Sequence, residues 1–272
     1  MSLTCLNTPH PNLNSTLHGN GILELVLQRP ERKNAFFAEF YLAVAQALSE
    51  ADQSVKVKVV LLRGEQDFCA GNDLQDFVDN PPTNSDSPAF LLLRAAASFS
   101  KPLIMAVKGV AIGIGSTLLL HADLVYADSK ARFQMPFLSL GLTPEGGSTL
   151  LLPERAGYLK AAEILMLAEP FNAQAAQEAG LVNQVIADDH TPEHAGNDVY
   201  AYAMSKAVRL TQLPVATLKT TKQLLRKPIS QVTERINLEG EFFIERARSP
   251  AMHEAIAAFK EKRVPDFGQF ED

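Results

Sequence analysis

The chain has 272 residues, a formal net charge of -6 and a sequence pI of about 5.6. Its 46% hydrophobic and 21% charged residues are typical of a folded protein of this length, and without a surplus of Lys and Arg we expect no nucleic-acid partner. Two cysteines, Cys5 and Cys69, are too few for a disulfide framework, which favours the reducing cytoplasm.

The sequence predicts no targeting or membrane segment. The first 18 residues have neither a basic start nor an apolar run, so they do not have the pattern of a secretion signal. The longest apolar window, 109–120, is shorter than the ~20 residues that a membrane-spanning helix needs. We therefore expect a protein that does not enter a membrane.

A strand, a helix and a second strand are predicted first. Residues 21–28 alternate apolar and other side chains as a half-buried strand does. Residues 36–51 carry apolar side chains at helical spacing, with Asn34 as the expected N-cap, and 56–63 form another strand. This order implies a crossover connection and a layer of helix on sheet.

Loop residues and buried strands follow. Residues 78–88 gather Pro, Asn, Ser and Asp and predict a surface loop, and Ser87-Pro88 is a typical start for a helix over 90–99. A buried strand over 102–108 leads into a glycine-rich turn, after which residues 123–127 form another strand.

From about residue 155 the pattern becomes helical. A short strand is predicted over 181–186. The predicted helices are 157–168, 172–179, 199–210, 214–225, 231–248 and 250–260. We expect residues 1–195 to form a mixed α/β core and residues 196–272 an all-helical region.

Two glycine-rich segments each follow a predicted strand. "GIGSTLLL" begins like a dinucleotide-binding fingerprint, but Leu118 stands where the third glycine would be, no P-loop lysine follows, and Ser116 lacks the context of a nucleophile elbow. "DFCAGNDL" can equally be an ordinary loop in which Asn72 or Asp73 caps a helix. Because both turns lead from a strand into a helix, together they can present two unobstructed backbone N–H groups to one oxyanion.

Residues 141–154, "GLTPEGGSTLLLPE", place Glu145 beside two glycines and before a run of leucines. Apolar neighbours, among them Phe137, Leu138 and Leu142, would raise the pKa of this acid, whereas a helix N-terminus just after it would lower the pKa, and the sequence leaves both open. Taken alone, Glu145 can equally be a common acidic residue at the start of a helix.

The histidines carry no predicted function. His190 and His194 lie in a polar segment, where metal binding is a minor alternative to a solvated loop. His121 and His253 are expected to be packed or surface groups. We therefore predict no metal site.

These segments, in this order and spacing, closely resemble the crotonase (enoyl-CoA hydratase/isomerase) superfamily. The resemblance covers about residues 20 to 265 and is carried by "RPERKNAF", "FCAGNDL", "KGVAIGIGSTLLLHADLVYA", "ARFQMPFLSLGLTPEGGSTLLLP" and "AAQEAGLVNQVI". It implies a crotonase-like spiral of ββα turns with a C-terminal helical trimerisation region, assembled as a homotrimer or a dimer of trimers. It also implies an acyl-CoA substrate, of which coenzyme A is a part, and no separate cofactor.

Position by position, the resemblance assigns two oxyanion donors to the backbone N–H groups of Asn72 and Ile114. Alanine is more usual at the first of these positions, so Asn72 departs from the family pattern. The other residues that the resemblance places at the substrate or at coenzyme A are Arg32, Lys33, Ala35, Ala70, Gly71, Asp73, Leu74, Gly113, Phe137, Phe259 and Lys262. For the last two, an ordinary charged helix end is the alternative.

The acidic positions discriminate between the reactions of this superfamily. Hydratases of the family use two glutamates, and the equivalent positions here hold Thr117 and Phe137, which cannot orient and split water. Glu145 matches the base of Δ3,Δ2-enoyl-CoA isomerases, particularly the peroxisomal type, in which one carboxylate serves both carbons. The resemblance thus implies a Δ3,Δ2-enoyl-CoA isomerase of fatty acid β-oxidation with Glu145 as the catalytic residue.

Other functions stay open at this point. A ring-type isomerase or a thioester or dehalogenase-like hydrolase would share the oxyanion donors and differ in pocket shape. A weak hydratase would show hydration despite Thr117 and Phe137. A non-catalytic acyl-CoA-binding module would share the pocket without the chemistry.

Overall fold

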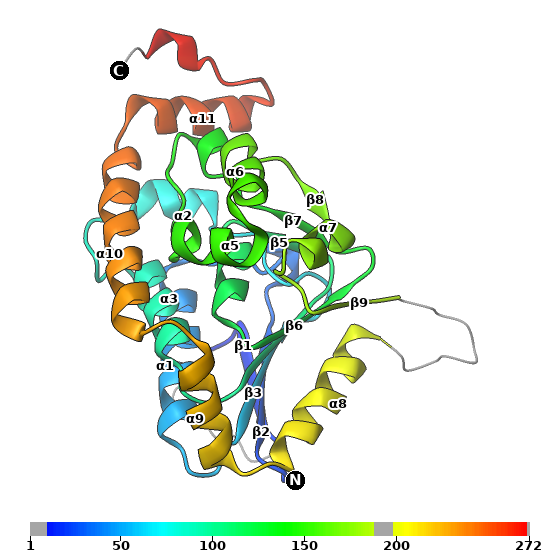
Figure 1. Ribbon diagram of the computed structural model, residues 1–272. Coiled ribbons are helices and arrows are strands. Elements are labelled where there is room, and N and C mark those ends of the chain that lie inside the picture. Colours follow the sequence, from blue (N-terminus) through cyan, green and yellow to red (C-terminus); the bar gives the residue numbers. More distant parts are fainter. Residues whose placement is uncertain (1–9, 188–197, 271–272) are drawn as a thin grey trace.

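The computed structural model describes residues 10–187 and 198–270, and within these ranges the strands form two sheets (Figure 1). The larger sheet has the order β1-β2-β3-β4-β6-β9 and the smaller one the order β5-β7-β8. The strands of the larger sheet are β1 (Leu13–Leu17), β2 (Ile22–Leu27), β3 (Val59–Gly64), β4 (Leu103–Val107), β6 (Leu124–Asp128) and β9 (Gln184–Ile186). Those of the smaller sheet are β5 (Val110–Ile112), β7 (Arg132–Gln134) and β8 (Phe171–Asn172).

Most of the larger sheet is parallel. β1 pairs antiparallel with β2, whereas β2, β3, β4, β6 and β9 pair in parallel along the sheet. Parallel neighbours need crossover connections, and α1 (Ala38–Gln53) provides the first one, between β2 and β3. The predicted α/β class is therefore confirmed.

Helices form most of the connections and the C-terminal region. After α1 they are α2 (Leu74–Asp79), α3 (Pro88–Ser98), α4 (Ile114–Thr117), α5 (Ser148–Ala156), α6 (Tyr158–Leu167), α7 (Ala173–Glu178), α8 (Val199–Thr211), α9 (Val215–Leu225), α10 (Ile229–Arg246) and α11 (Pro250–Glu261). Short 3-10 turns are η1 (Pro30–Arg32), η2 (Leu118–His121), η3 (Leu138–Leu140) and η5 (Phe267–Gln269). Between 198 and 270 no strand forms, as the sequence predicted for this region.

The larger sheet is buried on both faces because successive side chains of its strands are apolar. In β3, Val60 and Leu62 pack into the main core, whereas Val59 and Leu61 face the opposite side. Helices α1 and α3 lie on the first side of the sheet and α8 on the second (Figure 1). The residues of α8 that complete the second core are Val199, Ala203 and Ala207.

Asn34 does not cap α1, contrary to the sequence prediction. The helix begins at Ala38, and Asn34 lies in the left-handed region with φ 57°. Its side-chain oxygen accepts a hydrogen bond from the Arg29 N–H at 2.7 Å, and its amide donates to the Asp67 carbonyl at 2.6 Å. Asn34 thus joins the loop after β2 to the loop after β3, and its side chain is used for these contacts instead of capping α1.

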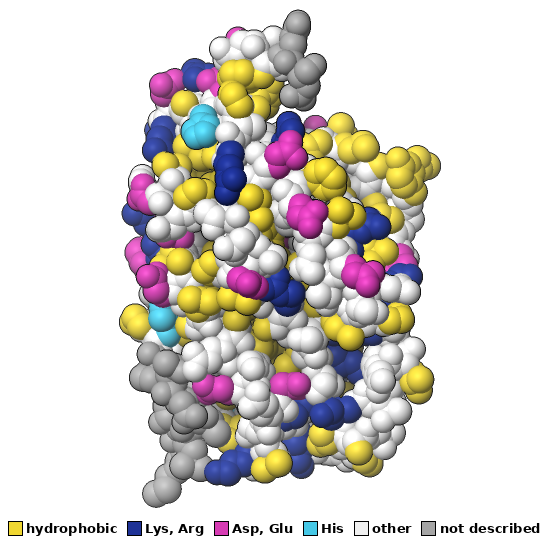
Figure 2. Space-filling view, turned by 90° about the vertical axis from the view of Figure 1, so that its left-hand side faces the viewer, with side chains coloured by type: hydrophobic (Ala, Val, Ile, Leu, Met, Phe, Trp, Pro, Cys, Tyr) yellow, Lys and Arg dark blue, Asp and Glu magenta, His cyan; other side chains and the backbone are white. Residues whose placement is uncertain are grey.

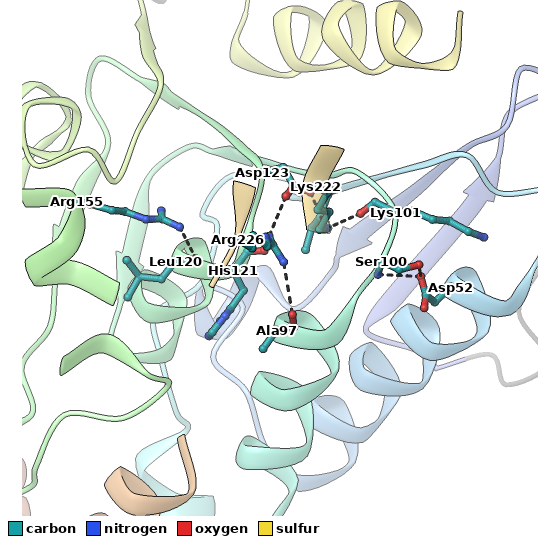
Figure 3. A network of polar contacts seen from close by, with 11 residues as sticks. Asp52, Ala97, Ser100, Lys101, Leu120, His121, Asp123, Arg155, Lys222 and Arg226 are labelled. Atoms are coloured by element: carbon teal, nitrogen blue, oxygen red, sulfur yellow. Dashed lines mark hydrogen bonds and ion pairs between the residues drawn. The ribbon is translucent and has the colours of Figure 1, made fainter. Parts of the chain in front are cut away.

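A buried charge cluster attaches α9 to the larger sheet (Figure 3). Lys222 donates to the Asp123 carboxylate at 2.7 Å and to the Lys101 carbonyl at 2.6 Å, and Arg226 pairs with the other oxygen of Asp123 at 2.9 Å. Asp123 directly precedes β6 and also accepts the Leu103 N–H at 2.8 Å, at the start of β4. One carboxylate therefore joins two neighbouring strands to the C-terminal helices.

Surface charges are mixed on the side of the molecule toward which α10 lies, where acidic and basic side chains are interspersed (Figure 2). An anionic ligand on this side would therefore need local cations, because no extended basic surface is seen there. None of the helices in the described ranges is both long and apolar enough to cross a bilayer.

Candidate active site

The two glycine turns singled out from the sequence lie side by side. The Cys69 N–H donates to the Val110 carbonyl at 2.9 Å, and the Ile112 N–H donates back to the Cys69 carbonyl at 2.9 Å. The chain segment before Gly71 thus pairs in parallel with β5, which leads directly to Gly113. Both turns consequently emerge at the same edge of the small sheet.

Both turns depend on glycine. The φ angle is 92° at Gly71 and 55° at Gly113, a region that L-residues with side chains rarely adopt. A Cβ on Gly113 would lie 3.9 Å from Gly71 Cα, and a Cβ on Gly71 would lie 3.0 Å from the Ile112 carbonyl oxygen. The absence of side chains here therefore lets the two backbones approach each other and leaves their N–H groups accessible.

The amides that follow these glycines belong to Asn72 and Ile114. Across residues 10–187 and 198–270, neither N–H donates a hydrogen bond to another residue. Ile114 is the first residue of α4, which is only one turn long and continues as η2, so the helix dipole behind its N–H is that of a short helix. Two unpaired donors thus stand on neighbouring turns.

Cys69 lies beneath the first turn and is fully buried. Its Sγ accepts the Gly71 N–H at 3.3 Å. Burial raises the pKa of the thiol to about 12, so the sulfur stays protonated and acts as packing rather than as a nucleophile.

The loop with Arg32 and Lys33 lies against the first glycine turn. The Ala70 N–H donates to the Lys33 carbonyl at 2.9 Å. Ala35 is buried in this loop, whereas the side chains of Arg32 and Lys33 are exposed. Two predicted cations are therefore placed on the surface next to the turn.

A cavity of about 570 Å³ lies beside the two turns, and its wall is mostly apolar, with side chains from α1, α2, α3, α10 and α11. The structure brings together most of the predicted site. The predicted residues in the cavity wall are Ala70, Gly71, Asn72, Leu74, Gly113, Ile114, Phe137, Glu145 and Phe259. Those outside the wall are Arg32, Lys33, Ala35, Asp73 and Lys262, and their contact with a ligand stays a prediction.

Glu145 lies in the turn before α5 with only 4% of its surface exposed. One carboxyl oxygen accepts a hydrogen bond from the Thr117 hydroxyl at 2.5 Å. The other oxygen, Oε2, is buried and has no hydrogen-bond partner among the described residues. Few buried polar atoms in folded proteins lack a partner, and besides Glu145 the described residues have three, on Asp128, Thr143 and Ser148; of these four atoms only that of Glu145 belongs to a residue of the cavity wall.

Asp76 is a second carboxylate in the cavity wall, but its two oxygens are occupied. One accepts the Ala38 N–H at 3.0 Å, and the other accepts the Asn80 side-chain amide at 2.9 Å. Asp76 therefore fixes the start of α1 and the end of α2. Of the two carboxylates, only Glu145 keeps an oxygen available.

The pKa of Glu145 is raised to about 8, chiefly by burial, while the Thr117 hydrogen bond lowers it and the negative charge of Glu239 raises it further. The sequence left open whether burial or the nearby helix N-terminus would dominate. Burial is the largest cause of the raised pKa, and the N–H groups of Gly147 and Thr149, at the start of α5, donate to the Glu239 carboxylate at 2.5 and 2.9 Å rather than to the Glu145 carboxyl.

His121 supports the same turn from η2. Its Nε2 lies 2.8 Å from the Gly146 carbonyl oxygen, and because a carbonyl only accepts, Nε2 carries the proton. Burial lowers the pKa of His121 to about 3, so the ring stays neutral. The sequence assigned His121 no function, and the structure gives it this structural one.

Tyr41 adds a polar group to the cavity wall. Its hydroxyl donates to the Asn72 side-chain oxygen at 2.5 Å, and the Asn72 amide nitrogen donates to the Asp73 carbonyl at 3.2 Å. Asp73 caps α2 and pairs with Arg29 at 2.7 Å, so of the two predicted caps it is the one that forms. The side chain of Asn72 is therefore held in place by its neighbours.

Leu138, expected from the sequence to be an apolar neighbour of Glu145, is not part of the cavity wall. Its side chain is 39% exposed because it lies in the short turn η3, whereas Phe137 and Leu142 are buried and line the cavity. At the C-terminal end, Phe259 is exposed but still reaches the cavity wall. Arg263, which was not predicted, lines the wall where Lys262 does not, and it pairs with Glu254.

The sequence does not predict the residues that support the glycine turns and Glu145. From the sequence, Thr117 is notable only because it replaces a glutamate of the hydratases. Its spacing of four residues from Gly113, about one helical turn, is the signal that places it near the second glycine turn. Tyr41 was identified only as part of the apolar face of a helix. No sequence signal pointed to Arg263 in particular, since it is one of several charges at a helix end.

No metal-binding cluster of three or more His, Cys, Asp or Glu side chains occurs among the residues that the structure describes. His253 is exposed and bonds the Ser249 carbonyl at 2.8 Å. His190 and His194 lie outside the described residues.

The chain is similar to known proteins over nearly its whole length. The sequence model of the enoyl-CoA hydratase/isomerase family matches residues 18–270. A 1,2-epoxyphenylacetyl-CoA isomerase of Escherichia coli K12 is 33% identical, with 91% of this chain and 95% of that protein covered. A 2,3-dehydroadipyl-CoA hydratase of the same strain is 34% identical, with 90% of this chain and 94% of the relative covered.

A solved structure agrees with the fold. The crystal structure of a protein described as an enoyl-CoA hydratase/isomerase from Acinetobacter baumannii has a TM-score of 0.85 and 52% identity, covering 93% of this chain and 100% of the other. One relative is named as an isomerase and one as a hydratase, so similarity alone does not separate the two reactions. The fold, the paired glycine turns and the matched length together place this chain in the enoyl-CoA hydratase/isomerase family, the crotonase superfamily.

Proposed function

We propose that this protein is a Δ3,Δ2-enoyl-CoA isomerase in which Glu145 is the single acid-base group. The proposal depends mainly on the Glu145 carboxyl, which is buried at an apolar cavity with one oxygen held by Thr117 and the other unpartnered among the described residues. Asp76 is the weaker candidate because each of its oxygens already accepts a hydrogen bond that fixes α1 or α2, whereas one oxygen of Glu145 accepts none from the described residues. One carboxyl group is thus available for proton transfer.

A carboxylate with a raised pKa suits proton abstraction next to a thioester. With a pKa of about 8, Glu145 is a stronger base than an exposed glutamate. In the proposed first step it takes a proton from C2 of a 3-enoyl thioester. The electron pair of the broken C–H bond forms a double bond between C1 and C2, and the negative charge moves to the thioester oxygen.

The N–H groups of Asn72 and Ile114 are the proposed donors to that oxygen. They stand on neighbouring turns and have no partner in the described parts of the chain, so they are free to stabilise the charge as it develops. Removing one such donor in other enzymes slows turnover roughly 100- to 1000-fold. Both donors belong to backbone segments that are joined to each other by hydrogen bonds between Cys69 and the residues Val110 and Ile112.

The second step returns the proton to C4. The C3–C4 double bond of the dienolate takes the proton from the Glu145 carboxyl at C4, the electron pair between C1 and C2 forms the C2–C3 double bond, and a lone pair of the oxygen restores the C1 carbonyl. Because C2 and C4 lie on one side of a short allylic unit, one carboxyl group can serve both. Hydration would need a second group to hold water, but Thr117 already donates to Glu145 and Phe137 is apolar.

Coenzyme A is anionic, whereas the chain carries a net charge of -6, so local cations are needed to bind it. Arg32 and Lys33 are exposed beside the first glycine turn and are the proposed contacts for its phosphates. Phe259 and Lys262, at the end of α11, are proposed as further contacts to a ligand at this or a neighbouring subunit. No other cofactor is proposed.

The test is an isomerase assay with short, medium and long 3-enoyl-CoA substrates, followed as formation of trans-2-enoyl-CoA without added cofactor. Glu145→Gln is expected to lower kcat at least about 100-fold, because general acid-base groups typically contribute that much. KM should change little, since the amide keeps the size of the side chain.

Asp76→Asn is the matched comparison, because it alters the other carboxyl group of the cavity and is expected to keep most of the activity. Crotonyl-CoA hydration serves as the control reaction. Isomerisation that persists in Glu145→Gln would reject the assignment. Hydration faster than isomerisation in the unmodified protein would favour a hydratase instead.

A further inference from the structure

Glu239 of α10 is buried, with only 5% of its surface exposed to solvent. It accepts three hydrogen bonds from the start of α5: from the Gly147 N–H at 2.5 Å, the Thr149 N–H at 2.9 Å and the Thr149 hydroxyl at 2.5 Å. Arg235, one turn earlier on α10, donates to the same hydroxyl at 3.1 Å. All three contacts of Glu239 are therefore with donors, which favour its charged form, while burial has the larger effect and raises its pKa above the ordinary value.

This arrangement replaces an ordinary helix cap. The first N–H groups of a helix have no partner inside it, and a Ser, Thr, Asp or Asn at the N-cap usually binds them. The N-cap of α5 is Gly147, which has no side chain. Glu145, the nearest acid in the sequence, lies two residues before Gly147 and is the other carboxylate that could take these donors.

We propose that Glu239 is a positioning residue of the active site, which occupies the N-terminus of α5, fixes the turn that carries Glu145 and keeps the backbone donors of this helix away from the Glu145 carboxyl. This inference rests on the proposed function, in which Glu145 is the base. It extends that function because Glu239, on a helix distant in the sequence, binds the α5 N–H groups and so leaves the Glu145 carboxyl without these donors.

The physical effect of Glu239 is to separate the ionisation of two neighbouring acids. If Glu145 accepted the α5 donors, they would stabilise its charged form and make it a weak base. They instead donate to Glu239, where they offset part of the effect of burial, which raises the pKa of Glu239, and so favour its charged form. That charge in turn disfavours a second negative charge on Glu145, in addition to the effect of burial.

Other groups that face Glu145 come from three more elements. Thr117 of α4 donates to its carboxyl, Tyr41 of α1 is close enough for the charge of Glu145 to raise the pKa of its hydroxyl, and neutral His121 of η2 donates to the Gly146 carbonyl. None of these carries a charge at neutral pH, because burial raises the pKa of Tyr41 far above its ordinary value and keeps His121 uncharged.

The charge that faces Glu239 is Arg235, which is partly exposed on α10 and partly compensates it. In the cavity wall, Arg263 is paired with Glu254. Removing the negative charge of Glu239 should therefore lower the pKa of Glu145, and removing the positive charge of Arg235 should raise it.

Glu239→Gln is the first test, with two readouts. One is the pH dependence of kcat/KM for a 3-enoyl-CoA substrate, whose acidic limb reports the pKa of the base. The other is a carbon-13 NMR titration of carboxyl-labelled glutamate in the ligand-free protein, with the Glu145 signal assigned by its loss in Glu145→Gln. We expect the pKa of Glu145 to fall by about half a unit or more, because a neighbouring charge is removed and a backbone donor is released. kcat should fall several-fold while KM stays nearly constant.

Arg235→Gln is the second test, and its partly exposed position makes it tolerant of change. We expect it to raise the pKa of Glu145. Thr149→Val is the matched control, because it removes one hydroxyl while both backbone donors and the charge of Glu239 remain, and it should leave the titration of Glu145 nearly unchanged.

A purely structural role would lower the melting temperature of Glu239→Gln and leave Glu145 titrating as in the unmodified protein, and that result would overturn the proposal. Should Glu239→Gln fail to fold, the Arg235→Gln titration decides, and the absence of any shift there counts equally against it. An unmodified protein without isomerase activity would reject the proposed function alone, because the NMR titration needs no turnover.

Discussion

The ionisation of Glu145 links the active site to the stability of the chain. Its pKa is about 8 in the folded protein, compared with an ordinary value of 4.5. Between these two pH values the folded state binds more protons than the unfolded state, so the free energy of unfolding decreases as the pH rises. The contribution of this residue is thus most favourable below pH 4.5 and is lost by the time the pH passes 8.

Glu145→Gln gives a direct measure of this effect, because glutamine does not titrate. We expect the difference in unfolding free energy between the unmodified protein and Glu145→Gln to decline from pH 4.5 to pH 8, by at most about 1.4 kcal/mol per pH unit. Urea unfolding at a series of pH values measures it. A difference that is constant with pH would show that the carboxyl does not change its protonation on folding.

Secondary-structure elements were predictable where a period or a turn residue marked them. β3 and α1 have clear patterns, and the C-terminal helices form close to their predicted ends. β1 was not predicted because its sequence, "LNSTL", is half polar, and the strands of the smaller sheet were not predicted as a sheet because each is three residues or shorter. Their pairing depends on contacts between segments distant in the sequence, and the local periodicity of apolar residues does not indicate such contacts.

The centre of the site was predictable for the same reason. Gly71 and Gly113 are visible in the sequence because a backbone turn needs glycine, and Glu145 stands beside two more. Asn34 and Glu239 were misassigned or missed, because each acts through a hydrogen bond to a segment far away in the chain. A side chain that caps a helix from another helix has no fixed sequence spacing.

At the level of elements, the Asp123 cluster is expected to hold α9 in place. Asp123→Asn removes the charge that compensates Lys222 and Arg226, and breaking a largely buried pair in this way typically costs about 3 kcal/mol. Chemical denaturation should therefore show a clear loss of stability. Lys160→Gln, which disturbs an exposed pair on α6, is the control and should change stability by less than about 0.5 kcal/mol. Equal effects from the two variants would mean that the cluster does not anchor α9.

At the scale of the molecule, two helices expose large apolar side chains that a single chain does not cover. On α6 and α9 these side chains are more than half exposed: Tyr158, Leu159, Met166, Leu167, Leu224 and Leu225. Grouped apolar exposure of this kind is typical of surfaces that bind another protein. We therefore propose that they contribute to the predicted homotrimer or dimer of trimers.

Sedimentation velocity of the purified protein tests this assembly. We expect a mass of three or six chains, and a shift toward a single chain when Leu224 and Leu225 are both replaced by Glu, because two charges would then have to be buried in the interface. Leu42→Glu, at a less exposed apolar position on α1, is the control and should leave the mass unchanged. A monomeric unmodified protein would contradict the proposal. A cytoplasmic location stays a prediction.

The thiol beneath the first glycine turn can serve as a built-in reporter of local opening. Cys69 is inaccessible and protonated while the turn stays paired with β5. In a protein whose Cys5 has been replaced, alkylation by a small reagent would then proceed only through molecules in which that pairing has transiently separated. Its rate would measure how often the proposed oxyanion donors part from each other, and slower labelling in the presence of a bound thioester would show that the ligand holds the two turns together.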